Sequence, residues 1–136
     1  MTDDVFYKDL DIRWGDQDNM GHVNNAVFST YFEEARAYFF EQVDIFIHKP
    51  LYPQQGPIMA ALELQFKQQL SWPARVRVLV RTVKIGNSSF HLSHELYSQA
   101  DELVCTGKAV IVWFHYGEQR SAPLPDSIRN KLKSKY

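Results

Sequence analysis

The sequence predicts an α+β domain in which a curved antiparallel sheet of about five strands wraps around one long central helix. Three observations lead to this prediction. Apolar and polar residues alternate over Phe6–Trp14, as they do in a half-buried strand. The stretch Asn24–Val43 contains neither glycine nor proline and repeats its apolar residues with the period of a helix. Further alternating runs follow, and the short turns between them favour antiparallel pairing.

The predicted helix is apolar over most of its circumference, which is typical of a helix buried on nearly all sides. The residues that recur with its main period are Phe28, Tyr31, Phe32, Ala35, Phe39 and Val43. At 1.5 Å per residue the helix would be about 30 Å long, enough to cross a whole small domain. We therefore expect it to lie at the centre, with the sheet around it.

The second half of the chain is predicted to form strands. A loop at Pro50–Pro57 ends the helical part, and the next run places five residues on one face of a strand: Ile58, Ala60, Leu62, Leu64 and Phe66. The later runs and the turns between them are Val76–Thr82, Gly86-Asn87, Phe90–Leu96, Ala100–Glu102 and Val104–Phe114. A short helix is expected at Pro125–Leu132. Because an open sheet leaves an unpaired edge, which a second copy could close, the sequence also predicts a dimer.

The composition is that of a globular chain. Its 136 residues, 45% of them hydrophobic, suffice for one domain over residues 1–136 and are too few for two. The net charge of −1 gives no support to nucleic-acid binding, and no apolar run approaches the roughly 18 residues of a membrane span. Met1–Asp4 is acidic and polar, unlike a secretory signal, so we expect a cytoplasmic protein. The single cysteine, Cys105, excludes an internal disulfide and is expected to be buried and inert.

The most informative segment is the polar loop before the helix, which reads Arg13-Trp14-Gly15-Asp16-Gln17-Asp18-Asn19-Met20-Gly21-His22-Val23-Asn24-Asn25. It places a carboxylate, Asp18, a few residues ahead of a helix start, where backbone N–H groups are unpaired and carry partial positive charge. A carboxylate and a set of aimed N–H donors are what is needed to attack a carbonyl and hold the resulting oxyanion. The segment therefore predicts hydrolysis of an acyl thioester.

This loop, followed by Tyr31-Phe32-Glu33-x-Ala35-Arg36, resembles the 4-hydroxybenzoyl-CoA thioesterase family of the hotdog fold, and most of all its small bacterial acyl-CoA thioesterases. The match is close over the first strand, the loop and the helix, and extends to the turn Ile85-Gly86-x-Ser88. The resemblance implies an acyl-CoA substrate, active sites at a dimer interface and dimers paired into a homotetramer. It also implies that no metal and no other cofactor is needed.

Four positions of the loop match catalytic positions of that family. Asp18 corresponds to the catalytic carboxylate, acting as a nucleophile or as a general base. Asn25 corresponds to the position whose backbone N–H polarises the thioester carbonyl. Gly21 would let the loop approach the substrate closely, and His22 matches a histidine that many members carry.

Substrate binding is assigned to the helix start and to a turn in the sheet. Some family members hold the CoA phosphates with a basic cluster after the third strand, where this chain has Lys84–Ser89 with one charged residue. We assign Lys84, Ser88 and Ser89 to substrate binding, together with Asn24, which is also a natural N-cap. Arg75, Arg77 and Arg81 could add a basic strip, because alternate strand residues share a face.

Several polar residues of the motif have structural interpretations. Asp16 is expected to be a partner of Arg13 or Arg36, and Glu33 or Glu34 to form an ion pair with Arg36. His22 is more often a solvated or capping residue than a direct substrate contact. Asp16, Asp18 and His22 lie in one loop with no distant fourth ligand, which is a poor pattern for zinc.

Two other functions compete with the thioesterase hypothesis. A hydratase or dehydratase of the same fold would resemble its class in a histidine motif of the His-Phe-Pro type, which this sequence lacks. A non-catalytic domain that binds acyl-CoA or acyl-carrier protein would keep the pocket without turnover. The sequence does not specify the acyl group or its carrier.

Overall fold

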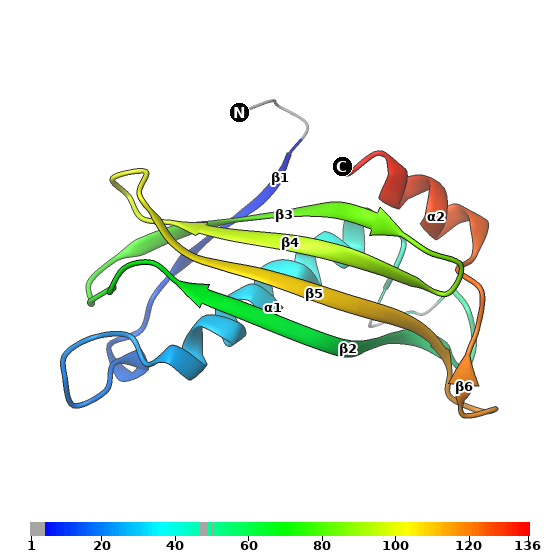
Figure 1. Ribbon diagram of the computed structural model, residues 1–136, viewed down its shortest axis with the longest axis horizontal. Coiled ribbons are helices and arrows are strands. Elements are labelled where there is room, and N and C mark those ends of the chain that lie inside the picture. The colour runs from blue at the N-terminus through cyan, green and yellow to red at the C-terminus, as the bar shows by residue number, and fades with distance from the viewer. Residues whose placement is uncertain (1–4, 47–48, 50) are drawn as a thin grey trace.

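The computed structural model describes residues 5–46, 49 and 51–136 (Figure 1). Its elements, in chain order, are β1 (Phe6–Asp11), a 3₁₀ turn (Trp14–Asp16), α1 (Asn25–Gln42), β2 (Gln55–Phe66), β3 (Arg75–Ile85), β4 (Ser89–Tyr97), β5 (Leu103–His115), β6 (Arg120–Ser121) and α2 (Asp126–Lys133). The predicted short helix at Pro125–Leu132 is thus present, shifted by one residue. Among the described residues, no helix is both long and apolar enough to cross a membrane.

The strands form one curved antiparallel sheet with the order β1-β3-β4-β5-β2, and β6 adds to β5. Figure 1 shows α1 crossing one face of this sheet, with the other face turned to the viewer. The loop before α1 and the turn between β3 and β4 lie at opposite ends of the sheet. The predicted α+β class is confirmed, and β2 is left as an edge strand.

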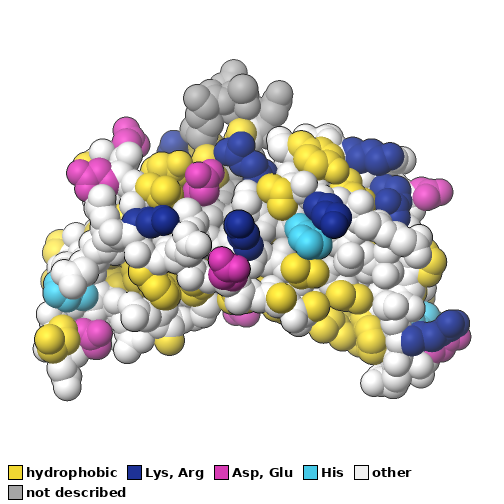
Figure 2. Space-filling model, viewed as in Figure 1, with side chains coloured by type: hydrophobic (Ala, Val, Ile, Leu, Met, Phe, Trp, Pro, Cys, Tyr) yellow, Lys and Arg dark blue, Asp and Glu magenta, His cyan; other side chains and the backbone are white. Residues whose placement is uncertain are grey.

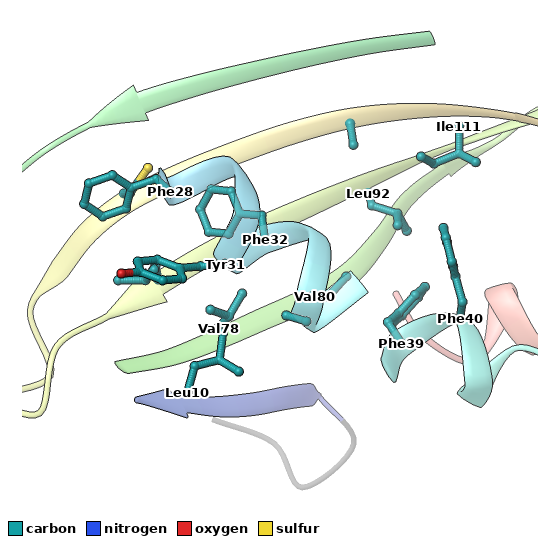
Figure 3. Close-up of a cluster of buried hydrophobic side chains, with 14 of the residues drawn as sticks. Leu10, Phe28, Tyr31, Phe32, Phe39, Phe40, Val78, Val80, Leu92 and Ile111 are labelled. Atoms are coloured by element: carbon teal, nitrogen blue, oxygen red, sulfur yellow. The ribbon is translucent and has the colours of Figure 1, made fainter. Parts of the chain in front are cut away.

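The core lies between α1 and the sheet, as the alternating pattern predicts (Figure 3). Phe32 points from α1 toward the sheet, and Phe28, Tyr31, Phe39 and Phe40 extend the same layer along the helix. Phe32 comes this close because it faces a glycine, Gly107 of β5. A Cβ at that position would lie 2.8 Å from the Phe32 ring.

The expectation of one long central helix and about five strands is not confirmed in full. The helix α1 has 18 residues, and the sheet has six strands. The second helix, α2, buries Ile128 and Leu132 in the same core as α1. These two apolar residues are four positions apart, so one face of a charged, eight-residue helix is enough to join the core.

The strand β2 departs from its prediction in two ways. It begins at Gln55, inside the stretch predicted as a loop, which an edge strand allows because Pro57 need not donate a ladder hydrogen bond. A bulge between Met59 and Ala61 then changes the alternation. Met59, rather than Ile58, therefore shares a face with Leu62, as their pairing with β5 shows. Pro50 and the acidic start Met1–Asp4 lie outside the described residues.

Candidate active site

The loop between β1 and α1 is held in shape by its own backbone. Gln17 and Val23 pair across it as an isolated antiparallel bridge. Inside that bridge, the N–H of Asp18 donates to the carbonyl of His22 at 2.9 Å, and the N–H of Gly21 donates to the carbonyl of Asp18 at 3.1 Å. Gly21 has φ of +79°, a left-handed conformation that favours glycine. The turn therefore presents Asp18 in a fixed place.

Asp18 is exposed and keeps part of its carboxylate free. Its Oδ1 accepts a hydrogen bond from the N–H of Met20 at 2.9 Å, which orients the side chain. Within the described residues, Oδ2 accepts no hydrogen bond from the protein. This oxygen is available to a substrate or to a water molecule.

The start of α1 is capped so that one backbone donor remains exposed. Asn24 is the N-cap, and its Oδ1 accepts from the N–H of Ala26 at 2.9 Å. The N–H of Val27 donates to the carbonyl of Asn24 at 2.9 Å. The N–H of Asn25 belongs to the first turn, whose donors have no partner within the helix, and it makes no hydrogen bond inside the described part of the chain. It carries part of the positive charge of the helix N-terminus.

A hollow of about 490 Å³ brings these groups together. Asp18, His22 and Asn25, three of the four residues assigned to catalysis from the sequence, line one side of it. The other side comes from Phe66–Gln69 at the end of β2, and the ring of Phe66 packs edge-on against Phe28 with centroids 5.6 Å apart. The site is therefore built from two segments about forty residues apart in sequence, joined by the hydrogen bond from the N–H of Val23 to the carbonyl of Leu70. Along the chain, the residues that line the hollow come first from the loop, then from the start of α1 and last from the end of β2.

A profile of the thioesterase-like superfamily matches residues 12–132. The chain belongs to this superfamily. It is similar to a Thermus thermophilus thioesterase whose crystal structure contains coenzyme A and Zn, at 34% identity and a TM-score of 0.81 over 96% of this chain and 93% of that one. It is also similar to the PA2801 protein of Pseudomonas aeruginosa, at 33% identity and a TM-score of 0.84 over 93% and 97% of the two chains. A sequence relative, protein YsmA of Bacillus subtilis, is 26% identical over 79% of this chain and 71% of its own length. Family and fold together make this protein a thioester hydrolase.

Asp16 of this thioesterase has a structural role, although it lies two residues from Asp18. It is only 4% exposed, and its carboxylate accepts hydrogen bonds from the backbone and side chain of Arg13 and, at 2.7 Å, from the hydroxyl of Tyr31. Burial raises the pKa of Asp16, but these hydrogen bonds outweigh it and hold the pKa below its ordinary value. Burial and the neighbouring Asp16 raise the pKa of Tyr31. The predicted partnership with Arg13 is confirmed, and Asp16 anchors the loop between β1 and α1 to that helix.

The predicted ion pair between Arg36 and Glu33 or Glu34 is wrong. Arg36 is 6% exposed, and its Nη1 lies 3.3 Å from Nε2 of the fully buried His94 on β4. Burial and the charge of Arg36 lower the pKa of His94 to about 3, so the imidazole is neutral. Sequence periodicity placed His94 on an opposite face from His91 but gave no sign of Arg36 as its neighbour.

The turn assigned to CoA binding does not join this site within one chain. Lys84, Ser88 and Ser89 lie at the β3–β4 turn, at the opposite end of the sheet from Asp18. The eleven-residue β3 that separates the two ends is about 35 Å long. Asn24 lies beside Asn25, but its side chain caps the helix.

The predicted basic strip is largely neutralised. Each arginine on this face of β3 meets a carboxylate, and the pairs are Arg75–Asp11 at 3.6 Å, Arg77–Asp9 at 2.8 Å and Arg81–Glu95 at 3.5 Å. Figure 2 shows basic and acidic side chains interspersed over the sheet face. Among the described residues, no group of three or more His, Cys, Asp and Glu side chains is placed to hold a metal ion.

Proposed function

We propose that this thioesterase hydrolyses an acyl-CoA and holds the thioester carbonyl between Asp18 and the first N–H groups of α1. One observation carries the proposal: a carboxylate with an unengaged oxygen and the free N–H of Asn25 line the same hollow. The loop motif supports the 4-hydroxybenzoyl-CoA thioesterase branch of the superfamily, with residues 1–136 as a single hotdog domain. The CoA-bound Thermus relative supports CoA as the carrier.

Hydrolysis of a thioester needs few catalytic groups, because a thiolate is a good leaving group. As a nucleophile, Asp18 adds to the thioester carbon, the C–S bond breaks, and CoA leaves as a thiolate that takes up a proton. Water then hydrolyses the mixed anhydride and restores the carboxylate. As a general base, Asp18 would instead take a proton from the attacking water. We favour the nucleophile, because Oδ2 of Asp18 is unengaged and lies in the hollow where it can add directly to the thioester carbon.

The oxyanion that forms on the carbonyl is stabilised by the N–H of Asn25. A single backbone donor of this kind contributes roughly 3 kcal/mol in other enzymes. Gly21 supports the site by allowing the left-handed turn that places Asp18. His22 lines the same hollow and is a second side chain that a bound thioester would contact.

The edge strand β2 is the proposed dimer interface. Ile58, Met59, Leu62 and Phe66 are 37–45% exposed on it, although they are large and apolar. Figure 2 shows hydrophobic side chains gathered along the lower rim of the view, over β2. An unpaired apolar edge favours pairing with a second strand, and a two-fold pairing of β2 would cover this edge of the sheet. We extend this dimer to a tetramer, in which Lys84, Ser88 and Ser89 of a neighbouring subunit contact the CoA.

The test is release of free thiol from a panel of acyl-CoAs by the wild type, Asp18→Asn and a control, Asp11→Asn. Asp11 is also exposed and lies on the neighbouring strand end, outside the hollow. Turnover should fall by orders of magnitude in a folded Asp18→Asn protein and stay near wild type in the control. Absence of thiol release from every acyl-CoA would contradict CoA as the carrier and direct the assay to acyl-carrier protein.

A further inference from the structure

Three large apolar side chains lie exposed beside the Asp18 hollow and form an apolar rim. Trp14 is 70% exposed, Met20 is 78% exposed and Trp72 is 47% exposed. Met20 also lines the hollow itself, so the apolar rim is continuous with the site. Figure 1 shows its two segments, the loop before α1 and the connection from β2 to β3, at the same end of the sheet. Exposed apolar clusters of this kind mark places where a ligand or a partner binds.

The two tryptophans are held near each other by Gln17. Its Oε1 accepts a hydrogen bond from the N–H of Trp72 at 2.9 Å, and its Nε2 donates to the carbonyl of Trp14 at 3.5 Å. A second link joins the same two segments, since Oγ of Ser71 donates to the carbonyl of Gly21 at 2.9 Å. Both bonds to Gln17 use backbone atoms of the tryptophans, so the indoles themselves are left to contact a ligand.

The rim offers polar groups as well as aromatic surface. Within the part of the chain that the structure describes, neither indole Nε1 donates a hydrogen bond. The side chain of Arg13, next to Trp14, is 82% exposed, and it binds Asp16 through Nε and Nη2. Its Nη1 makes no hydrogen bond inside the same described ranges. Aromatic and guanidinium planes stack on bases, and arginine donates to phosphate, so this combination suits a nucleotide.

The area of the rim fits a small ring system rather than a protein. A tryptophan side chain has about 250 Å² to cover, so at these exposures the two indoles leave roughly 300 Å² uncovered. Each partner in a stable protein complex covers about 800 Å². With Met20 included, the rim stays well below that area. A stacked purine base is a matching occupant, because every base has an aromatic face that an indole can cover.

We infer that the adenine ring of CoA stacks on Trp14 and Trp72 of the same chain whose Asp18 holds the thioester. The flexible pantetheine arm joins the thioester to this ring, and Trp14 lies four residues from Asp18, which is at most about 14 Å. The inference rests on the proposed function for the identity of the ligand. It adds a site for the base that needs no second subunit, whereas the contacts proposed for the β3–β4 turn concern the phosphates.

A substrate that lacks the nucleotide tests this site. The measured quantity is the ratio of kcat/KM for an acyl-CoA to kcat/KM for the acyl-pantetheine with the same acyl group. Trp14→Ala and Trp72→Ala should each lower this ratio about tenfold, because stacking of the base is lost. Trp14→Phe and Trp72→Phe keep an aromatic face and should restore most of the ratio. Tyr38→Ala is the matched control, since Tyr38 is 47% exposed on α1 and packs against Lys8 of β1, outside the rim.

Tryptophan fluorescence tests binding without turnover. The third tryptophan, Trp113, is only 2% exposed, so quenching by a ligand reports on the two indoles of the rim. The probes are CoA, adenosine 3′,5′-bisphosphate, which is the nucleotide end alone, and pantetheine, which is the arm alone. CoA and the bisphosphate should quench the wild type, and pantetheine should not. The double variant Trp14→Phe with Trp72→Phe should lose this quenching.

Each outcome decides between the two claims. An equal fall for acyl-CoA and acyl-pantetheine overturns the inference, because the substitution then acts on the loop and not on the base. An unchanged ratio overturns it while the proposed function stands, and a smaller assembly of both alanine variants in size-exclusion chromatography would then assign the rim to a subunit contact. Quenching by CoA without thiol release from any acyl-CoA overturns the proposed function and leaves the nucleotide site. Absence of both overturns both.

Discussion

The hydrogen bond from Tyr31 to Asp16 provides a direct test of how the loop that carries Asp18 is anchored. Tyr31→Phe removes one hydroxyl, whose oxygen lies 2.7 Å from Oδ2 of the buried carboxylate. Asp16 keeps its hydrogen bonds from the backbone and side chain of Arg13, so the loss is a single charge-assisted bond. Such a bond contributes about 2 kcal/mol to the free energy of unfolding. For a chain of this length that corresponds to a fall in Tm of about 7 °C.

The assay is equilibrium unfolding in urea at one fixed protein concentration, because the stability of the proposed dimer would depend on concentration. Tyr38→Phe is the control, since Tyr38 is 47% exposed on the same helix and its hydroxyl has no part in the anchor. A double-mutant cycle with Asp16→Asn isolates the pair, and most of the loss in Tyr31→Phe should vanish when Asp16 is already replaced. A cost below about 0.5 kcal/mol for Tyr31→Phe, or additive effects in the cycle, would refute the anchoring argument.

Two further predictions concern packing and pH. Gly107→Ala places a methyl group 2.8 Å from the ring of Phe32 and should lower the free energy of unfolding by about 1–3 kcal/mol. Gly15→Ala serves as the control in the same urea titration, because a Cβ at Gly15 would have no atom within 4 Å. The lowered pKa of Asp16 means that its stabilisation is complete above its ordinary pKa near 3.8 and is lost as pH falls through the lower pKa of the folded state. The urea midpoints of the wild type and Tyr31→Phe should therefore converge as the pH is lowered below about 4, and a constant gap down to about pH 2 would contradict the assignment.

The alternation of apolar residues was sufficient to predict the strands because one face of the sheet packs on α1. In β4 the buried residues Phe90, Leu92, His94 and Leu96 follow this period, and all of them except His94 are apolar. The pattern could not show the bulge in β2, since Met59 and Ile58 are both apolar and either could face the helix. It also could not show that His94, on the buried face, lies next to the side chain of Arg36.

The Asp18 side of the candidate site was predictable because its residues are close in sequence. Asp18, His22 and Asn25 lie within eight positions, and the local turn and cap bring them into one hollow. The other wall, Phe66–Gln69, reaches the loop through long-range contacts: the pairing of β2 with β5, the packing of Phe66 on α1 and the hydrogen bond from the N–H of Val23 to the carbonyl of Leu70. No local sequence signal marks those residues, since lysine and glutamine after a strand are ordinary surface residues.

Large apolar residues of β2 remain exposed in the single chain, although the sequence pattern predicts that they are buried. Leu62 and Phe66 follow the alternation of apolar and polar residues that predicts a buried face, yet they are 39% and 45% exposed. The simplest resolution is that their burying partner is another copy of the same strand. Pairing at this edge would cover the apolar strip. Because Phe66 at the end of β2 also lines the Asp18 hollow, the same strand would contribute to both the assembly and the site, so substitutions along β2 that alter one are expected to alter the other.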